Sequence, residues 1–107
     1  MVAPPIDELE LVYQQICLAL GDPKRMQILY TLYDGPCNVT SIAECLNYPQ
    51  PTVSRHLALL RQRGMLDSWR EGTHVLYQIS DKRIIDILDA MRELLKDTLK
   101  RQSSVLI

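Results

Sequence analysis

The chain has 107 residues, of which 47% are hydrophobic and 23% charged, and its net charge is −1. This length suits a single domain with one core, and the composition is that of a globular protein. The apolar runs are too short to cross a bilayer, and the N-terminus lacks the basic start and apolar stretch of a signal peptide. We therefore expect no membrane partner and a cytoplasmic location.

The distribution of charge is more informative than its sum. A net charge near zero argues against a nucleic-acid partner, since phosphate binding depends on basic surface. Residues 1–46, however, carry two basic and six acidic side chains, whereas residues 47–80 carry four arginines against two acids, together with His56 and His74. A local basic patch is what DNA contact requires, although a solvated charged face has the same composition.

Two helices are predicted in the first third of the chain. Residues 6–20 place apolar side chains at helical spacing and stop before Gly21. Asp22 is a good N-cap and Pro23 suits the first helical position, so a second helix starts there and ends at residues 34–36.

Residues 40–63 have the pattern of a helix-turn-helix. Asn38 or Thr40 can cap a short helix, residues 47–49 break the chain, and Pro51 opens another helix. In this arrangement the second helix can enter a major groove about 12 Å wide while the first crosses the DNA backbone.

The rest of the chain predicts a hairpin and a long helix. Residues 66–70 and 74–79 alternate like strands around a turn at 71–73, which forms a wing over 66–79. Residues 81–101 carry a continuous apolar stripe at helical spacing, made of Ile84, Ile87, Leu88, Met91, Leu94, Leu95 and Leu99. The fold class is therefore mainly α with a small β-hairpin, a single winged helix-turn-helix domain over residues 1–107.

The second helix of the helix-turn-helix carries the candidate reading residues. Val53, Leu57 and Leu60 recur on one side and must pack inward, which turns the opposite face outward. Its N-terminal half offers groups that base edges and phosphates accept. The candidate DNA-binding residues are Gln50, Thr52, Ser54, Arg55 and His56. For His56 the sequence leaves open whether it contacts DNA or packs against its own helix or under the turn.

Three segments resemble the ArsR/SmtB family of bacterial winged-helix repressors: 20–29 (LGDPKRMQIL), 51–61 (PTVSRHLALLR) and 70–72 (REG). The resemblance extends from about Leu9 to Leu99. It implies a homodimer built from helices 6–20 and 81–101, an inverted-repeat operator in double-stranded DNA, and release by an inducer. It also assigns wing contacts to the minor groove or flanking phosphates, through Arg70, Thr73 and His74. The apolar stripe independently indicates a partner, because a domain this small buries little of it. The alternative is that the stripe is a core face within one chain.

The metal sites known in such repressors are not matched. The arsenic-type positions before the turn hold Asn38, Thr40 and Ala43, without a thiolate. The zinc-type positions of the last helix hold Asp81, Arg83, Leu94 and Asp97, without an imidazole. The persulfide-sensing pair also fails, since its first position is Tyr30. We therefore expect no bound metal or cofactor.

Three cysteines remain, and an odd number at this density favours reduced thiols. Cys45 is expected to be a small core residue. Cys37 precedes a helix start, where exposure and the helix dipole are expected to lower its pKa and make it reactive. Cys17 lies on the expected dimer helix. The inducer, if these thiols sense one, would be an arsenical or another thiol-reactive compound; the alternative is that all three are inert.

Nothing in the chain predicts an enzyme. No paired carboxylates, Gly-rich phosphate loop or nucleophile with an orienting base can be placed. We expect a DNA-binding transcriptional regulator, most simply a repressor. The alternative is a winged-helix module that binds another protein without specific DNA binding.

Overall fold

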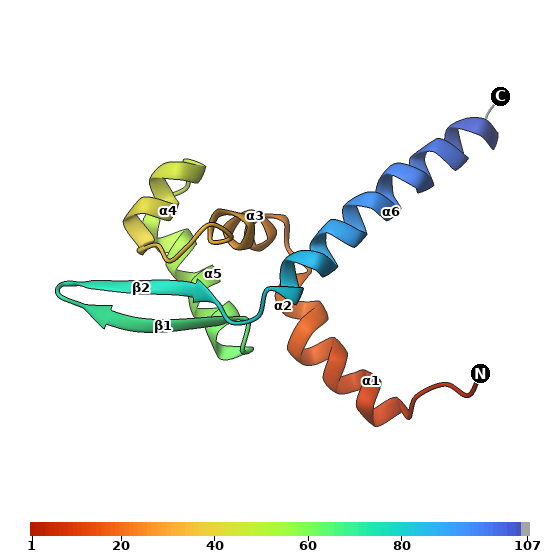
Figure 1. The fold of residues 1–107 in the computed structure, drawn as a ribbon, viewed down its shortest axis with the longest axis horizontal. Helices are drawn as coiled ribbons and strands as arrows, with labels where there is room; N and C mark the ends of the chain where they lie inside the picture. Colours follow the sequence, from red (N-terminus) through yellow and green to blue (C-terminus); the bar gives the residue numbers. More distant parts are fainter. Residues whose placement is uncertain (106–107) are drawn as a thin grey trace.

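The structure, a computed structural model, describes residues 1–105. It confirms a mainly helical fold with one two-stranded antiparallel hairpin. The hairpin tip lies at one end of the molecule, and the N-terminal and C-terminal helices project from the other end (Figure 1). Residues 106 and 107, which the sequence assigns to the same domain, lie outside the described part.

The N-terminal helix is built from three consecutive segments, namely α1 (Ile6–Val12), a π-helical turn η1 (Tyr13–Cys17) and α2 (Leu18–Leu20). Backbone angles at both junctions stay helical, so the segments form one rod. The helix ends at Gly21, where a Cβ atom would lie 2.8 Å from the carbonyl oxygen of Cys17. This approach is closer than any side chain tolerates, so glycine is required.

The next two helices are capped by side chains. Asp22 accepts hydrogen bonds from the backbone N–H groups of Lys24 at 2.9 Å and Arg25 at 3.2 Å, which starts α3 (Pro23–Thr31). Asn38, rather than Thr40, caps α4 (Val39–Leu46) by accepting from the N–H of Ser41 at 2.8 Å. Each cap satisfies a donor that the helix itself leaves unpaired.

The tight turn that joins α4 to α5 (Gln50–Gln62) begins at Asn47. Asn47 has a left-handed backbone with φ of 57°, a conformation that asparagine adopts more readily than most residues. The turn therefore fixes the direction in which α5 leaves α4.

The hairpin pairs β1 (Leu66–Glu71) with β2 (His74–Ile79), in the register that matches Leu66 with Ile79. The turn has two residues rather than the predicted three, because Glu71 still pairs with His74. A positive φ of 64° at Gly72 makes this tight turn possible.

The last helix, α6 (Arg83–Val105), starts two residues later than predicted and is longer. The carboxylate of Asp81 accepts from the N–H of Arg83 at 2.9 Å, which supports its first turn. None of the helices described over residues 1–105 combines the length and the apolar character needed to cross a membrane.

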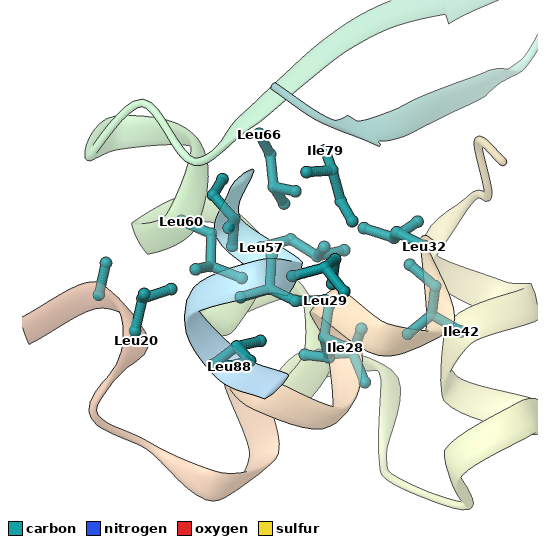
Figure 2. Packing of buried hydrophobic residues seen from close by; sticks show 14 of the residues in the cluster. Leu20, Ile28, Leu29, Leu32, Ile42, Leu57, Leu60, Leu66, Ile79 and Leu88 are labelled. Carbon is teal, nitrogen blue, oxygen red and sulfur yellow. The ribbon is translucent and has the colours of Figure 1, made fainter. Parts of the chain in front are cut away.

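One cluster of aliphatic side chains forms the core (Figure 2). Helix α5 contributes Val53, Leu57 and Leu60, whereas the hairpin contributes only its base, Leu66 and Ile79. Within α6 the buried residues are confined to the first two turns: Ile84, Ile85 and Leu88. Most of the hairpin and most of α6 therefore extend beyond the core.

Candidate nucleic-acid interface

The outer face of α5 is exposed and polar. Opposite the buried stripe, Ser54, Arg55, Ala58 and Arg61 are all exposed and follow one another at helical spacing. The N-terminal half of this face is the part that the sequence predicts to read base edges.

The predicted reading residues differ in how freely they are presented. Gln50 is exposed, and its side-chain Nε2 donates to the hydroxyl of Thr40 at 3.2 Å, so α4 orients it. Thr52 is half-buried in the first turn of α5, while Ser54 and Arg55 are exposed. Their contacts with DNA stay predictions, and the structure places Ser54 and Arg55 most openly.

His56 is placed differently from its neighbours. It is half-buried, and its Nδ1 lies 3.3 Å from the guanidinium Nη1 of Arg25 on α3. Because arginine only donates, Nδ1 accepts and the ring proton of neutral His56 is on Nε2. Burial lowers the pKa of His56 below its usual value; the carboxylate of Asp22 opposes this shift, and the charge of Arg25 adds to it. Of the two placements the sequence left open, the structure favours packing between elements.

Arg25, which the sequence analysis did not single out, connects three parts of the domain. Its Nε donates to the carbonyl of Ala19 at 2.7 Å and its Nη2 to that of Leu18 at 2.8 Å, at the end of the N-terminal helix. Burial alone would raise the pKa of Asp22, but its hydrogen bonds and the nearby Arg25 charge bring it below the usual range. The only signal in the sequence was the position of Arg25 in the segment 20–29.

The wing is attached to the helix-turn-helix as well as to the core. Backbone hydrogen bonds join Cys37 and Tyr77 in both directions, at 3.1 and 2.9 Å. Closer to the tip, the amide of Asn38 donates to Nδ1 of His74, 3.4 Å away. The predicted wing residues Arg70, Thr73 and His74 are exposed at this end of the molecule.

The arginines separate into two groups by their partners. Those on α3 and α6 that neighbour a carboxylate form ion pairs with it: Arg25, Arg83 and Arg92. Within the described range, no ion pair or side-chain hydrogen bond involves Arg55, Arg61 or Arg70. In the described part of the chain, α5 and the wing therefore present guanidinium groups that no carboxylate neutralises, as does Arg101 near the end of α6.

The structure corrects two expectations about the cysteines. Cys45 is exposed rather than part of the core, because α4 turns Ile42 and Ala43 inward and leaves Cys45 on its outer side. Cys37 is half-buried, and burial raises the pKa of its thiol instead of lowering it. Cys17 is exposed on the N-terminal helix. No group of three or more His, Cys, Asp or Glu side chains within residues 1–105 is arranged to hold a metal ion.

A helix-turn-helix whose second helix and adjacent hairpin present unpaired guanidinium groups defines a winged helix-turn-helix domain of the DNA-binding class. Residues 22–68 match the family model described as bacterial regulatory protein, arsR family. An uncharacterised HTH-type transcriptional regulator of Methanocaldococcus jannaschii is 40% identical over 81 residues, which cover 75% of this chain and 91% of that one. The chain belongs to the arsR family, a family of transcriptional regulators rather than of enzymes.

Two further proteins are similar to this chain, one in sequence and one in structure. The transcriptional repressor SmtB of Mycobacterium tuberculosis is 34% identical over 90 residues, covering 83% of this chain and 67% of the repressor. The solution structure of a homodimeric winged helix-turn-helix DNA-binding domain from Mycobacterium bovis, a possible ArsR-family regulator, matches with a TM-score of 0.75 and 25% identity. That match covers 94% of this chain and 95% of the other.

Proposed function

We propose that this protein is a cytoplasmic transcriptional repressor that binds an inverted-repeat operator in double-stranded DNA as a homodimer and leaves it when an inducer binds. The observation that carries the proposal is that α5 and the adjacent wing expose three arginines without an ion-pair partner among residues 1–105, Arg55, Arg61 and Arg70, next to the polar start of α5. The relative SmtB is itself named a repressor.

We assign different parts of the DNA to α5 and to the wing according to where each lies in the domain. The N-terminal half of α5 enters the major groove, where Arg55 and Ser54 reach base edges and Gln50, Thr52 and His56 border them. The wing reaches the flanking backbone through Arg70, Thr73 and His74. Because Nδ1 of His74 accepts from Asn38, its Nε2–H is free to donate to a phosphate oxygen.

The homodimer is proposed from apolar surface that one chain leaves uncovered. No residue of α1 is buried, and beyond the core α6 exposes Met91 by 41%, Leu94 by 60%, Leu95 by 56% and Leu99 by 53%. Covering apolar surface is worth about 25 cal/mol per Å², so these two helices favour a second copy. A two-fold pair presents two copies of α5, which matches an inverted repeat.

The competing possibility is a winged-helix module that binds a protein. An acidic protein partner would also neutralise the arginines, but it would not require the open, hydrogen-bonding start of α5. For the inducer we propose a thiol-reactive compound such as an arsenical rather than zinc, with the exposed Cys17 and Cys45 as its first points of contact.

The test is a selection of duplexes from a random-sequence pool, followed by fluorescence anisotropy with the selected duplex and a scrambled one at several salt concentrations. We expect the selected duplexes to share one palindromic site. We also expect the logarithm of the binding constant to fall linearly with the logarithm of the salt concentration, with a slope of about −0.9 for each phosphate contacted. Selection without a consensus, together with salt-independent affinity, would contradict the proposal.

A further inference from the structure

A cleft of about 360 Å³ lies between the recognition helix and the wing. From α5 it is lined by Ala58 and Arg61. The hairpin supplies the remaining lining residues, which are Ser68, Trp69, Arg70, Val75 and Tyr77. The cleft therefore lies where the two proposed DNA-contacting elements meet.

The strand register explains why four of these five hairpin residues face the helix, whereas Trp69 belongs to the other face. Ser68 pairs with Tyr77 and Arg70 with Val75, in the same alternation as the buried pair at the hairpin base. Alternate residues share one face of a hairpin, so this row continues from the core outward beneath α5. On the helix side Ala58 presents only a methyl group, which leaves the space open.

The chemistry of the lining selects an anion. Two guanidinium groups and two hydroxyl groups line the cleft, and no carboxylate is among its lining residues. Neither Arg61 nor Arg70 has an ion-pair partner within residues 1–105. Guanidinium groups bind the oxygens of phosphate with paired, charge-assisted hydrogen bonds.

The position along α5 identifies the anion as part of DNA. Arg61 follows Arg55 by six residues, which places it about 9 Å further along the helix and about 120° around its axis, on the side of Ala58 that lines the cleft beside the wing. A helix whose first half reads base edges in a groove about 12 Å wide brings a residue that far along to the bordering backbone.

We propose that this cleft seats one phosphodiester group of the DNA backbone, held by the guanidinium groups of Arg61 and Arg70 together and by the hydroxyl of Ser68. The proposal rests on the proposed DNA-binding function. It assigns Arg61 and Ser68 to contacts with the DNA backbone. Arg61 would therefore contribute to binding of any DNA sequence, whereas Arg55 would contact base edges and contribute to sequence preference.

Trp69 is the only tryptophan in the chain and lies between Ser68 and Arg70 on β1, with its side chain on the other face of the hairpin, so its fluorescence reports on the wing next to the cleft. Titration of the wild-type protein with a 30-base-pair duplex should change its fluorescence, and the Arg61→Gln/Arg70→Gln variant should lose most of that change. Inorganic phosphate alone should have little effect at millimolar concentration. A saturable response to inorganic phosphate below that range would overturn the assignment to DNA.

Affinity measurements test whether Arg61 and Arg70 bind the same phosphate. Arg101→Gln, which removes the same charge from the far end of α6, is the matched control. Arg61→Gln and Arg70→Gln should each weaken selected and scrambled duplexes by the same factor, and the double variant should lower the salt slope by about 0.9, the value for one phosphate. A decrease of the salt slope by about 1.8, the value for two phosphates, would show that Arg61 and Arg70 bind different phosphates.

Replacing single phosphates of the duplex by neutral methylphosphonates locates the contact. One position should weaken wild-type binding, weaken each single variant by a smaller factor, and have no further effect on the double variant. If Arg61→Gln binds like Arg101→Gln while Arg55→Ala loses sequence preference, the cleft proposal fails and DNA binding stands. If wild-type affinity does not depend on salt at all, the proposed function itself fails.

Discussion

Nη1 of Arg25 lies 3.3 Å from Nδ1 of His56, and the same guanidinium donates to the last carbonyls of the N-terminal helix. A single, largely buried side chain thus joins the proposed dimer helix to the recognition helix. In Figure 1 the end of α2 lies where α3 and α6 meet, at the centre of the molecule. Arg25 therefore adds a polar link to the core contacts that hold α5 in place.

Replacing Arg25 should affect stability and DNA binding together. Arg25→Ala removes several charge-assisted hydrogen bonds and leaves the carbonyls of Leu18 and Ala19 without these partners, so unfolding free energy should fall by about 1.5–3 kcal/mol. Urea denaturation measures this loss. Arg101→Ala, at an exposed site, should change stability by less than about 0.5 kcal/mol. Equal stabilities of the two variants would show that the Arg25 contacts are not energetically important.

Stability should depend on pH through His56. Its pKa is lowered in the folded protein by burial, and Lys24, Arg25 and Arg55 add to this effect against Asp22. The unfolded chain therefore takes up the proton first, so stability is highest above pH 6.5 and falls as the pH decreases from there toward the folded pKa. Melting temperatures of the wild type and His56→Gln between pH 5 and 8 test this, in steps of about half a unit. The variant should show a flatter profile, and identical profiles would refute the assignment.

The dimer should depend on the exposed part of the α6 stripe. Leu94→Glu with Leu95→Glu places two charges on surface that is more than half exposed in one chain, so the fold should survive while the dimer dissociates. Sedimentation should give the monomer mass, with operator affinity reduced at least tenfold and an unchanged circular dichroism spectrum. A variant that remains dimeric would remove α6 from the interface.

Arg55 and Arg70 should serve DNA in different ways. Arg55→Ala should cost about 1–3 kcal/mol on the selected duplex if it makes a bidentate base contact, and should relax sequence preference. Arg70→Ala should weaken all duplexes alike. Competition between selected and scrambled DNA separates the two effects, and unchanged affinity in both variants would remove α5 and the wing from the reading surface.

The thiols should react in an order set by exposure and pKa. In the native protein, Cys45 should be labelled by a maleimide several times faster than Cys37, whose thiol is half-buried with a raised pKa. In urea the two rates should converge, which provides the internal control. Faster labelling of native Cys37 would restore it as the reactive thiol.

Local chemistry made much of the fold predictable. The cap at Asp22, the break after Asn47 and the alternation of residues 74–79 each follow from a few adjacent residues. What local chemistry does not encode is which neighbour a side chain meets. Leu88 and Leu95 belong to the same predicted stripe, yet Leu88 is in the core and Leu95 is exposed.

The same reason explains the differences within the site. Arg55 and His56 are adjacent and both hydrophilic, but only His56 faces Arg25, from an element 31 residues away. Cys45 has the helical spacing of a core residue, and only the packing of α4 shows that it points outward. The π-helical turn at Tyr13–Cys17 likewise has no counterpart in the periodicity.

The backbone bonds between Cys37 and Tyr77, and the contact between Asn38 and His74, hold the wing to the start of α4 as well as to the core. The spacing between the wing and α5 is therefore set by the protein before DNA arrives. A duplex whose groove width or curvature does not match that spacing has to be deformed, and the energy of deformation depends on base steps that no side chain touches. The protein should consequently prefer certain operators even at base pairs that it does not contact. At those positions the preference should depend on the stiffness and groove width of the DNA rather than on the hydrogen-bonding pattern of the bases.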